Sequence, residues 1–347
     1  MAMKKTRVLA FSLLLAMALL VGCGSNGGST ETPPITKGDS VKTGMAVITA
    51  VNESVDATAN ADGVAQADST IVGVMVADDG RIVKCMIDAA QSKINFSNAG
   101  KLITALNTQY ETKQELGDDY GVKKTSTIGK EWNEQINALA DYVTGKTIDE
   151  VKGIAVTETG VPTGADLKSS VTIKINTFID AIEKAVANAK DLGAKADDKL
   201  GMGVVTNIAK STDATEAEEG LAQIDSNYAI LTLDSGGKIT SSVIDASQTG
   251  INFTAAGKIT TDLKAEQQTK GERGDSYGMK KASSLGKEWN EEAAAFAEYI
   301  VDKTVADVKG IAVSEAGKAT GSDLSSSVTI SVTPFITAVE KAGKAAK

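Results

Sequence analysis

Two neighbouring stretches of the chain alternate β-branched and polar residues. Residues 70–76 and 81–87 have this pattern, and Asp78, Asp79 and Gly80 supply turn chemistry between them. Successive side chains of a strand point to opposite faces, and an Asp-Gly pair reverses the chain easily. The pattern therefore predicts an antiparallel β-hairpin, and it returns around residues 235–237.

Further along the chain, apolar residues recur with helical spacing. Residues 131–143 are expected to form one helix, whose apolar positions are Trp132, Ile136, Leu139, Ala140 and Val143. A second helical pattern closes the first half of the chain, with apolar positions at Phe178, Ile179, Ile182 and Ala185. Thr147 and Glu150 have capping-box spacing, which predicts a short helix, and residues 151–156 are expected to form a strand. Thr333 is expected to be an N-cap, with Pro334 at the first helical position.

These patterns occur twice. Trp289 follows Trp132 by 157 residues (289 − 132), and Asp245 follows Asp88 by the same offset. Residues 44–190 align with residues 201–347 without a gap. The alignment predicts tandem duplicated α+β domains over these ranges, each an antiparallel sheet with amphipathic helices, joined by a linker at residues 191–200.

The N-terminal stretch has the pattern of an export signal. Lys4, Lys5 and Arg7 precede an apolar run that is short for a membrane span, and the run ends at Cys23 in a sequence that looks like a bacterial lipobox. This predicts a lipoprotein signal peptide at residues 1–22, lipid on Cys23, a flexible linker at residues 23–43, and a position on the extracytoplasmic face of the cell membrane. An ordinary secretory signal is the alternative.

Composition excludes several classes of chemistry. The chain has no histidine, so histidine-based catalytic triads and histidine-ligated metals are excluded. Its formal net charge of −9 argues against a nucleic-acid partner. The carboxylates of residues 118–119, Glu131 and Glu134 lack EF-hand spacing, and no metal site is expected. Cys85 is expected to be a small strand residue, with a reactive thiol as the alternative.

A second shared block runs over residues 120–134 and 277–291. Its glycines could bring backbone N–H groups close to a phosphate, and its lysines would add positive charge. Trp132 and Trp289 could offer a flat surface to an aromatic ligand, or they could belong to the hydrophobic core.

The strongest candidate for chemistry is a hydroxyl-rich segment that also occurs in both halves. Each copy places an aspartate, two serines and a threonine ahead of a helical pattern: Asp166, Ser169, Ser170 and Thr172, then Asp323, Ser326, Ser327 and Thr329. The order resembles the Asp-x-x-Ser-Gly-Ala-Thr motif of FMN-binding domains, with Ser-Val in place of Gly-Ala. A strand at residues 171–175, with Thr172 on its polar face, is the alternative interpretation.

The resemblance implies that a flavin transferase esterifies the phosphate of FMN to Thr172 and Thr329. It also implies an electron carrier, similar to the two-domain flavinylated lipoproteins of Gram-positive extracellular electron transfer, that receives electrons from a membrane quinone-dependent dehydrogenase. Such a carrier need not be an enzyme with a defined substrate. A small-ligand-binding lipoprotein and a structural surface lipoprotein without covalent flavin are the alternatives.

Overall fold

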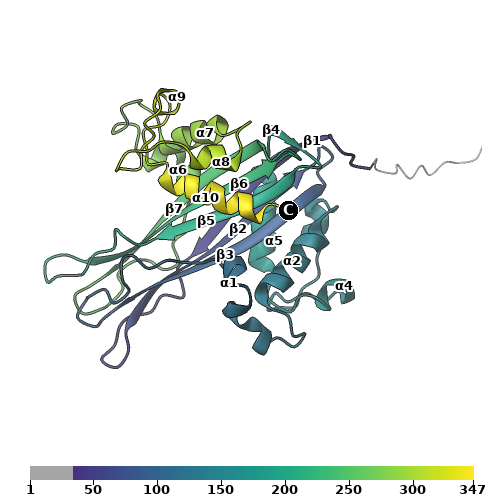
Figure 1. The fold of residues 1–347 in the computed structure, drawn as a ribbon. Helices are drawn as coiled ribbons and strands as arrows, with labels where there is room; N and C mark the ends of the chain where they lie inside the picture. Colours follow the sequence, from purple (N-terminus) through teal and green to yellow (C-terminus); the bar gives the residue numbers. More distant parts are fainter. Residues whose placement is uncertain (1–33) are drawn as a thin grey trace, which may run out of the picture. The chain divides into compact units, whose positions relative to one another are not determined.

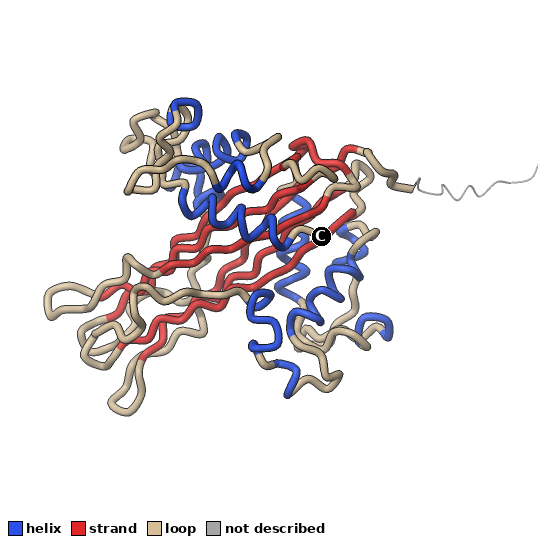
Figure 2. Tube along the Cα trace, viewed as in Figure 1, coloured by secondary structure: helices blue, strands red, loops and turns tan. Residues whose placement is uncertain are grey.

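Seven strands form two antiparallel sheets in the computed structural model, which describes residues 34–347 (Figures 1 and 2). The predicted signal peptide, Cys23 and most of the predicted N-terminal linker lie outside the described residues. One sheet has the order β3-β2-β1-β4 and the other β5-β6-β7. The strands are β1 (Ser40–Ala50), β2 (Gly63–Val76), β3 (Ile82–Phe96), β4 (Lys190–Lys195), β5 (Lys199–Asn207), β6 (Gly220–Leu233) and β7 (Ile239–Phe253).

Ten α-helices and three 3₁₀-helices connect or cover the strands of this part of the chain. The α-helices are α1 (Lys113–Leu116), α2 (Trp132–Val143), α3 (Ile148–Lys152), α4 (Ala165–Lys168), α5 (Asn176–Ala187), α6 (Lys270–Arg273), α7 (Trp289–Tyr299), α8 (Val305–Lys309), α9 (Ser322–Ser325) and α10 (Thr333–Ala345). The 3₁₀-helices are η1 (Gly117–Tyr120), η2 (Val122–Lys124) and η3 (Gly274–Tyr277). No helix among residues 34–347 is long and apolar enough to cross a membrane.

The predicted hairpin is confirmed as β2 and β3. Val76 pairs with Ile82 next to the turn, and pairing continues to Gly63 and Phe96 at the far end. Gly80 has a φ of +85°, a conformation that glycine adopts without steric cost. The strands are thus longer than the β-branched runs that predicted them.

The predicted helices are also present. Glu131 is the N-cap of α2, and Thr147 forms the expected capping box with Glu150 at the start of α3. α10 begins at Thr333 itself, with Val332 as its N-cap, so the predicted cap is displaced by one residue.

Three predicted segments differ from the structure. Residues 151–156 do not form a strand, because Val151 and Lys152 complete α3 and only Val156 makes an isolated bridge, to Pro162. Residues 191–200 are not a free linker: β4 pairs with β1, where Thr43 lies opposite Lys190, and β5 begins at Lys199. The predicted N-terminal linker likewise ends earlier than residue 43, because β1 begins at Ser40.

The two sheets pack face to face and share a core. Val41, Met45 and Ile71 of the first sheet contact a cluster that contains Met202 and Tyr228 of the second. The outer face of the first sheet is covered by α2 and α5, and that of the second by α7 and α10 (Figure 1). Residues Ile35–Lys347 accordingly form one compact unit. That its two halves arose by duplication is a prediction from the sequence alone.

Phe96 and Phe253 meet in a second cluster that joins the halves. Their rings stack with centroids 4.3 Å apart and an interplanar angle of 12°, and both side chains are fully buried. Ala57, Ile94 and Ile251 belong to the same cluster. The last residues of β3 and β7 therefore help to hold the two sheets together.

Asp88 of β3 is a buried carboxylate at the junction of sheet and helix. One of its oxygens accepts hydrogen bonds from the backbone N–H groups of Ala89 (2.7 Å) and Gln114 (3.1 Å). Burial raises the pKa of Asp88 to about 6, although these N–H groups and Thr112 favour the carboxylate. Asp245 binds Ala246 and Gly271 in the same manner, and burial raises its pKa as well.

Replacing Phe96 with alanine should remove the ring stack and leave a cavity between the sheets. We expect Phe96→Ala to lower the free energy of unfolding by about 3–5 kcal/mol, measured by urea denaturation. Ile103→Ala is the control, because Ile103 is 50% exposed and its truncation should change the free energy by less than about 0.5 kcal/mol. A cost below about 1 kcal/mol for Phe96→Ala would contradict the stack as a stabilising contact.

Asp88 should make stability depend on pH. Its pKa is higher in the folded chain than its ordinary value, so its contribution is fully present in acid and is lost as the pH rises through about 6. We expect wild type to lose about 1–3 kcal/mol of unfolding free energy from this group between acid and neutral pH, and Asp88→Asn to lack that component. Urea denaturation across the pH range, with exposed Asp166→Asn as control, measures the difference; identical pH profiles for wild type and Asp88→Asn would contradict it.

Candidate functional site

The hydroxyl-rich segment forms a turn that is anchored by two apolar side chains. In the first half, the segment begins within α4 and ends before α5, and Leu167 and Val171 are buried in the core beneath α2. The backbone N–H of Val171 donates to the carbonyl of Leu167 (2.8 Å), which closes the turn. Residues 171–175 are therefore irregular, and the alternative prediction of a strand is wrong.

This geometry explains the valine that stands where FMN-binding domains have alanine. Val171 is fully buried, and Val328 has the same place in the second half with 1% exposure. The extra methyl groups fill the core and do not lie on the exposed side of the turn. Thr172 and Thr329, which follow these valines, are both half-buried.

Thr172 is held by a buried glutamine of α2. Gln135 accepts hydrogen bonds at Oε1 from the backbone N–H of Thr172 (2.8 Å) and from its hydroxyl (3.1 Å). Its amide nitrogen donates to the carbonyl of Lys130 (3.1 Å), so the side chain is fixed at both ends.

Thr329 is held by a carboxylate instead. Glu292 of α7, which is fully buried, accepts from the backbone N–H of Thr329 (2.6 Å) and of Ile330 (3.0 Å). The hydroxyl of Thr329 lies 3.1 Å from both carboxylate oxygens, and the hydroxyl of Ser283 donates to one of them (2.8 Å). Glu292 therefore binds both the backbone and the side chain of Thr329 and positions this threonine tightly.

A cavity of about 450 Å³ opens beside Thr329. Its size lies within the range of small-molecule sites. The lining combines aromatic, basic and hydroxyl side chains, among them Trp289, Tyr277, Phe335, Lys210, Lys270, Lys318 and Thr329. These groups could hold an aromatic ligand that carries a negative charge.

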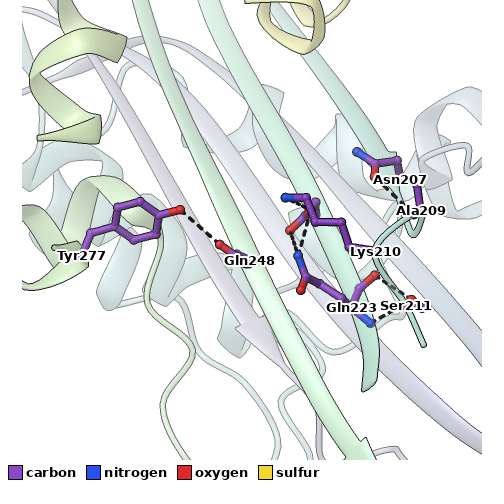
Figure 3. Close-up of polar contacts among 8 residues, drawn as sticks. Asn207, Ala209, Lys210, Ser211, Gln223, Gln248 and Tyr277 are labelled. Carbon is purple, nitrogen blue, oxygen red and sulfur yellow. Dashed lines mark hydrogen bonds and ion pairs between the residues drawn. The ribbon is translucent and has the colours of Figure 1, made fainter. Parts of the chain in front are cut away.

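Three residues that line this cavity, Lys210, Asp225 and Tyr277, make polar contacts with neighbouring side chains; Figure 3 draws these contacts. Tyr277 donates its hydroxyl to Gln248 Oε1 (3.1 Å), and Lys210 forms an ion pair with Asp225 at 3.0 Å. The side-chain amide of Gln223 donates to the carboxylate of Asp225 (2.9 Å), and the backbone carbonyl of Gln223 accepts a hydrogen bond from the hydroxyl of Ser211 (3.2 Å). These contacts thus tie Lys210 and Tyr277, which lie outside the strands, to β6 and β7 of the second sheet.

The two tryptophans are core residues. Trp132 is 4% exposed and contacts Phe178 edge-on at 6.1 Å, whereas Trp289 is 5% exposed and contacts Phe335 at 5.7 Å. Trp289 also lines the cavity beside Thr329. Lys270 lies 5.3 Å from the Trp289 ring centroid, a distance at which the ring face attracts a cation.

The aspartates and serines of the motif do not contact the threonines. Asp166 and Asp323 are exposed in the first turns of α4 and α9, and Ser169 donates its hydroxyl to the backbone carbonyl of Asp166 (3.0 Å). Ser326 donates in the same way to Asp323 (2.9 Å), and Ser327 donates to Leu324 (3.2 Å). Ser170 is half-buried at the end of the turn. These residues shape the surface around each threonine.

The glycine-containing loop does not offer all of its N–H groups to a ligand. Glu131, fully buried, accepts from the N–H groups of Val122 and Lys123 (both 2.8 Å), and Glu288 does the same with Met279 and Lys280. Burial disfavours the Glu131 carboxylate, but the N–H groups together outweigh it and hold its pKa below the ordinary value. These N–H groups are therefore already paired and are not available to a phosphate.

Cys85 packs into the core of the first half. It is buried, and burial raises the pKa of its thiol to about 12. Since the thiolate is the reactive form, this position favours a structural role over reactivity.

Sequence reasoning missed Gln135, Glu292 and Lys318. The first two occupy core-facing positions of α2 and α7, three residues after Trp132 and Trp289. A polar residue on an otherwise apolar helix face needs a buried partner, and this signal was present in the sequence.

No protein-family model and no solved structure matches the chain significantly. A chlorophenol reductase from Desulfitobacterium hafniense is 35% identical to the chain over 98 residues, which are 24% of this chain and 29% of that protein. The chain thus covers less than a third of the length of that relative.

Removing the acceptor of Gln135 should loosen the segment around Thr172. We expect Gln135→Leu to lower the free energy of unfolding by about 1–3 kcal/mol, because the N–H of Thr172 loses its buried partner. Exposed Gln109→Leu is the matched control and should be nearly neutral. Urea denaturation of both variants is the measurement, and equal stabilities would show that Gln135 does not hold Thr172.

Proposed function

We propose that the chain is a lipid-anchored extracytoplasmic electron carrier with FMN esterified to Thr172 and Thr329. The proposal rests chiefly on one observation: Thr329 lines a cavity that also contains basic side chains, which could bind the phosphate of FMN, and aromatic side chains, which could contact its ring system. Thr172 has the same place between a short helix and a long one in the first half.

The residues of the cavity fit the proposed cofactor. Lys270 and Lys318 could neutralise a phosphate beside the threonine, and Tyr277 and Trp289 could contact an aromatic ring system. When bound, the flavin would supply the redox chemistry that a chain without histidine or paired thiols lacks. The chain itself would bind the cofactor, fix its orientation and limit its contact with water.

The partners and the location follow from the same proposal. A flavin transferase would attach FMN, a membrane quinone-dependent dehydrogenase would supply electrons, and lipid on Cys23 would tether the protein to the cell membrane. The partial similarity to a protein named as a reductase supports a redox role. The proposed protein moves electrons and does not convert a substrate of its own.

A noncovalent ligand-binding lipoprotein is the second candidate. A further cavity of about 670 Å³ lies between the halves, lined by Met45, Leu192, Ile244 and Val301 among others, and it contains neither motif threonine. Polar residues such as Asn188, Asp245 and Glu272 share the lining with these apolar ones, so a ligand with both polar and apolar groups could occupy it without any covalent bond.

Co-expression with a flavin transferase tests the covalent proposal. We expect the intact mass to rise by two FMN-phosphoryl groups, and the yellow colour to persist after denaturation, because an ester survives unfolding. Thr172→Ala combined with Thr329→Ala should abolish both signals.

Serine is the matched control at each position. Thr172→Ser combined with Thr329→Ser keeps both hydroxyl groups and should still gain mass. A wild-type protein that gains no adduct beside an active transferase would refute covalent flavin and leave the ligand-binding alternative.

A further inference from the structure

The two threonines face chemically different partners. The hydroxyl of Thr172 donates to the neutral amide of Gln135, whereas that of Thr329 donates to the carboxylate of Glu292. Both partners are fully buried, and both come from the first turns of the helices α2 and α7. The partner of Thr329 is therefore an acidic side chain, and that of Thr172 is an amide at the equivalent position of its helix.

A carboxylate can accept a proton, and an amide cannot do so near neutral pH. A general base within hydrogen-bond reach of a hydroxyl accelerates attack by that hydroxyl about 10²–10⁴-fold. Glu292 has this reach, because its two oxygens lie 3.1 Å from Thr329 Oγ1. Gln135 can only orient Thr172.

Other hydrogen bonds keep the carboxylate in place during such a step. The N–H groups of Thr329 and Ile330 and the hydroxyl of Ser283 all donate to Glu292. None of these contacts involves Thr329 Oγ1, so they persist when the hydroxyl proton has left. The site thus provides a fixed proton acceptor beside the nucleophilic oxygen.

Resting on the proposed function, we propose that Glu292 is the general base for flavin attachment and makes Thr329 the faster of the two sites. Thr329 Oγ1 forms a bond to the FMN phosphorus of a flavin dinucleotide, and the pyrophosphate bond to the departing nucleoside monophosphate breaks. The leaving group takes the electron pair of that bond. The hydroxyl proton passes to Glu292 and then to solvent.

Single-acceptor proteins separate the two sites. Full-length Thr172→Ala retains only Thr329, and full-length Thr329→Ala retains only Thr172; each is incubated with purified flavin transferase and flavin dinucleotide, and adduct is followed by intact mass. We expect Thr329 to be modified at least about tenfold faster than Thr172.

Exchanging the partner residues tests the cause of the difference. Glu292→Gln in the Thr172→Ala protein should slow modification at least about tenfold, and Gln135→Glu in the Thr329→Ala protein should accelerate it. Faster modification of Thr172 in the Gln135→Glu variant would show that a carboxylate at this position promotes the reaction, because Glu292 itself is unchanged in that protein. Thermal unfolding of each variant identifies any loss of fold, and Gln135 already demonstrates that an amide is accommodated at this place in the fold.

The outcomes distinguish this inference from the function on which it rests. Adducts that form at equal rates with and without Glu292, or faster at Thr172, would overturn the role of Glu292 and leave the flavin carrier intact. Wild-type protein without an adduct at either threonine would overturn both.

Discussion

Burial of both faces of the sheets is the constraint on which the rest of the structure depends. The inner faces pack against each other through residues such as Met45 and Tyr228, and the outer faces are covered by helices. Gly44 and Gly203 allow the closest of these approaches, because a Cβ there would collide with the carbonyl oxygens of Ala185 and Ala338. Once the sheets are paired, each long helix has one place in which its apolar face can be buried.

The threonine sites follow from that arrangement. α2 and α7 lie on the outer faces, and their first turns carry Gln135 and Glu292 toward the segment that follows α4 or α9. Leu167 and Val171 fix that segment from below, which leaves Thr172 at the boundary between core and solvent. A residue at this boundary can be positioned by buried partners and still be reached from outside, which is what a site of covalent modification requires.

Local chemistry made much of the fold predictable. The hairpin turn at Gly80 and the helical spacing around Trp132 follow from short-range rules. The outer ends of β2 and β3 could not be predicted in the same way, because buried small and polar residues such as Ala65 and Ser92 face a neighbouring layer. The threonine motif was visible in the sequence, and Gln135 stood out as a polar residue on an apolar helix face. That these two residues bind each other could not be predicted, since they lie 37 residues apart and meet only through packing.

Glu131 and Glu288 hold their loops entirely through backbone N–H groups. Such an attachment is indifferent to the side chains that the loop carries. Met279 and Ala282 of the second half occupy the positions of Val122 and Thr125 in the first, and both loops still bind their glutamates in the same way. These loops are therefore places where evolution or engineering can alter the surface beside each threonine while the underlying framework stays unchanged.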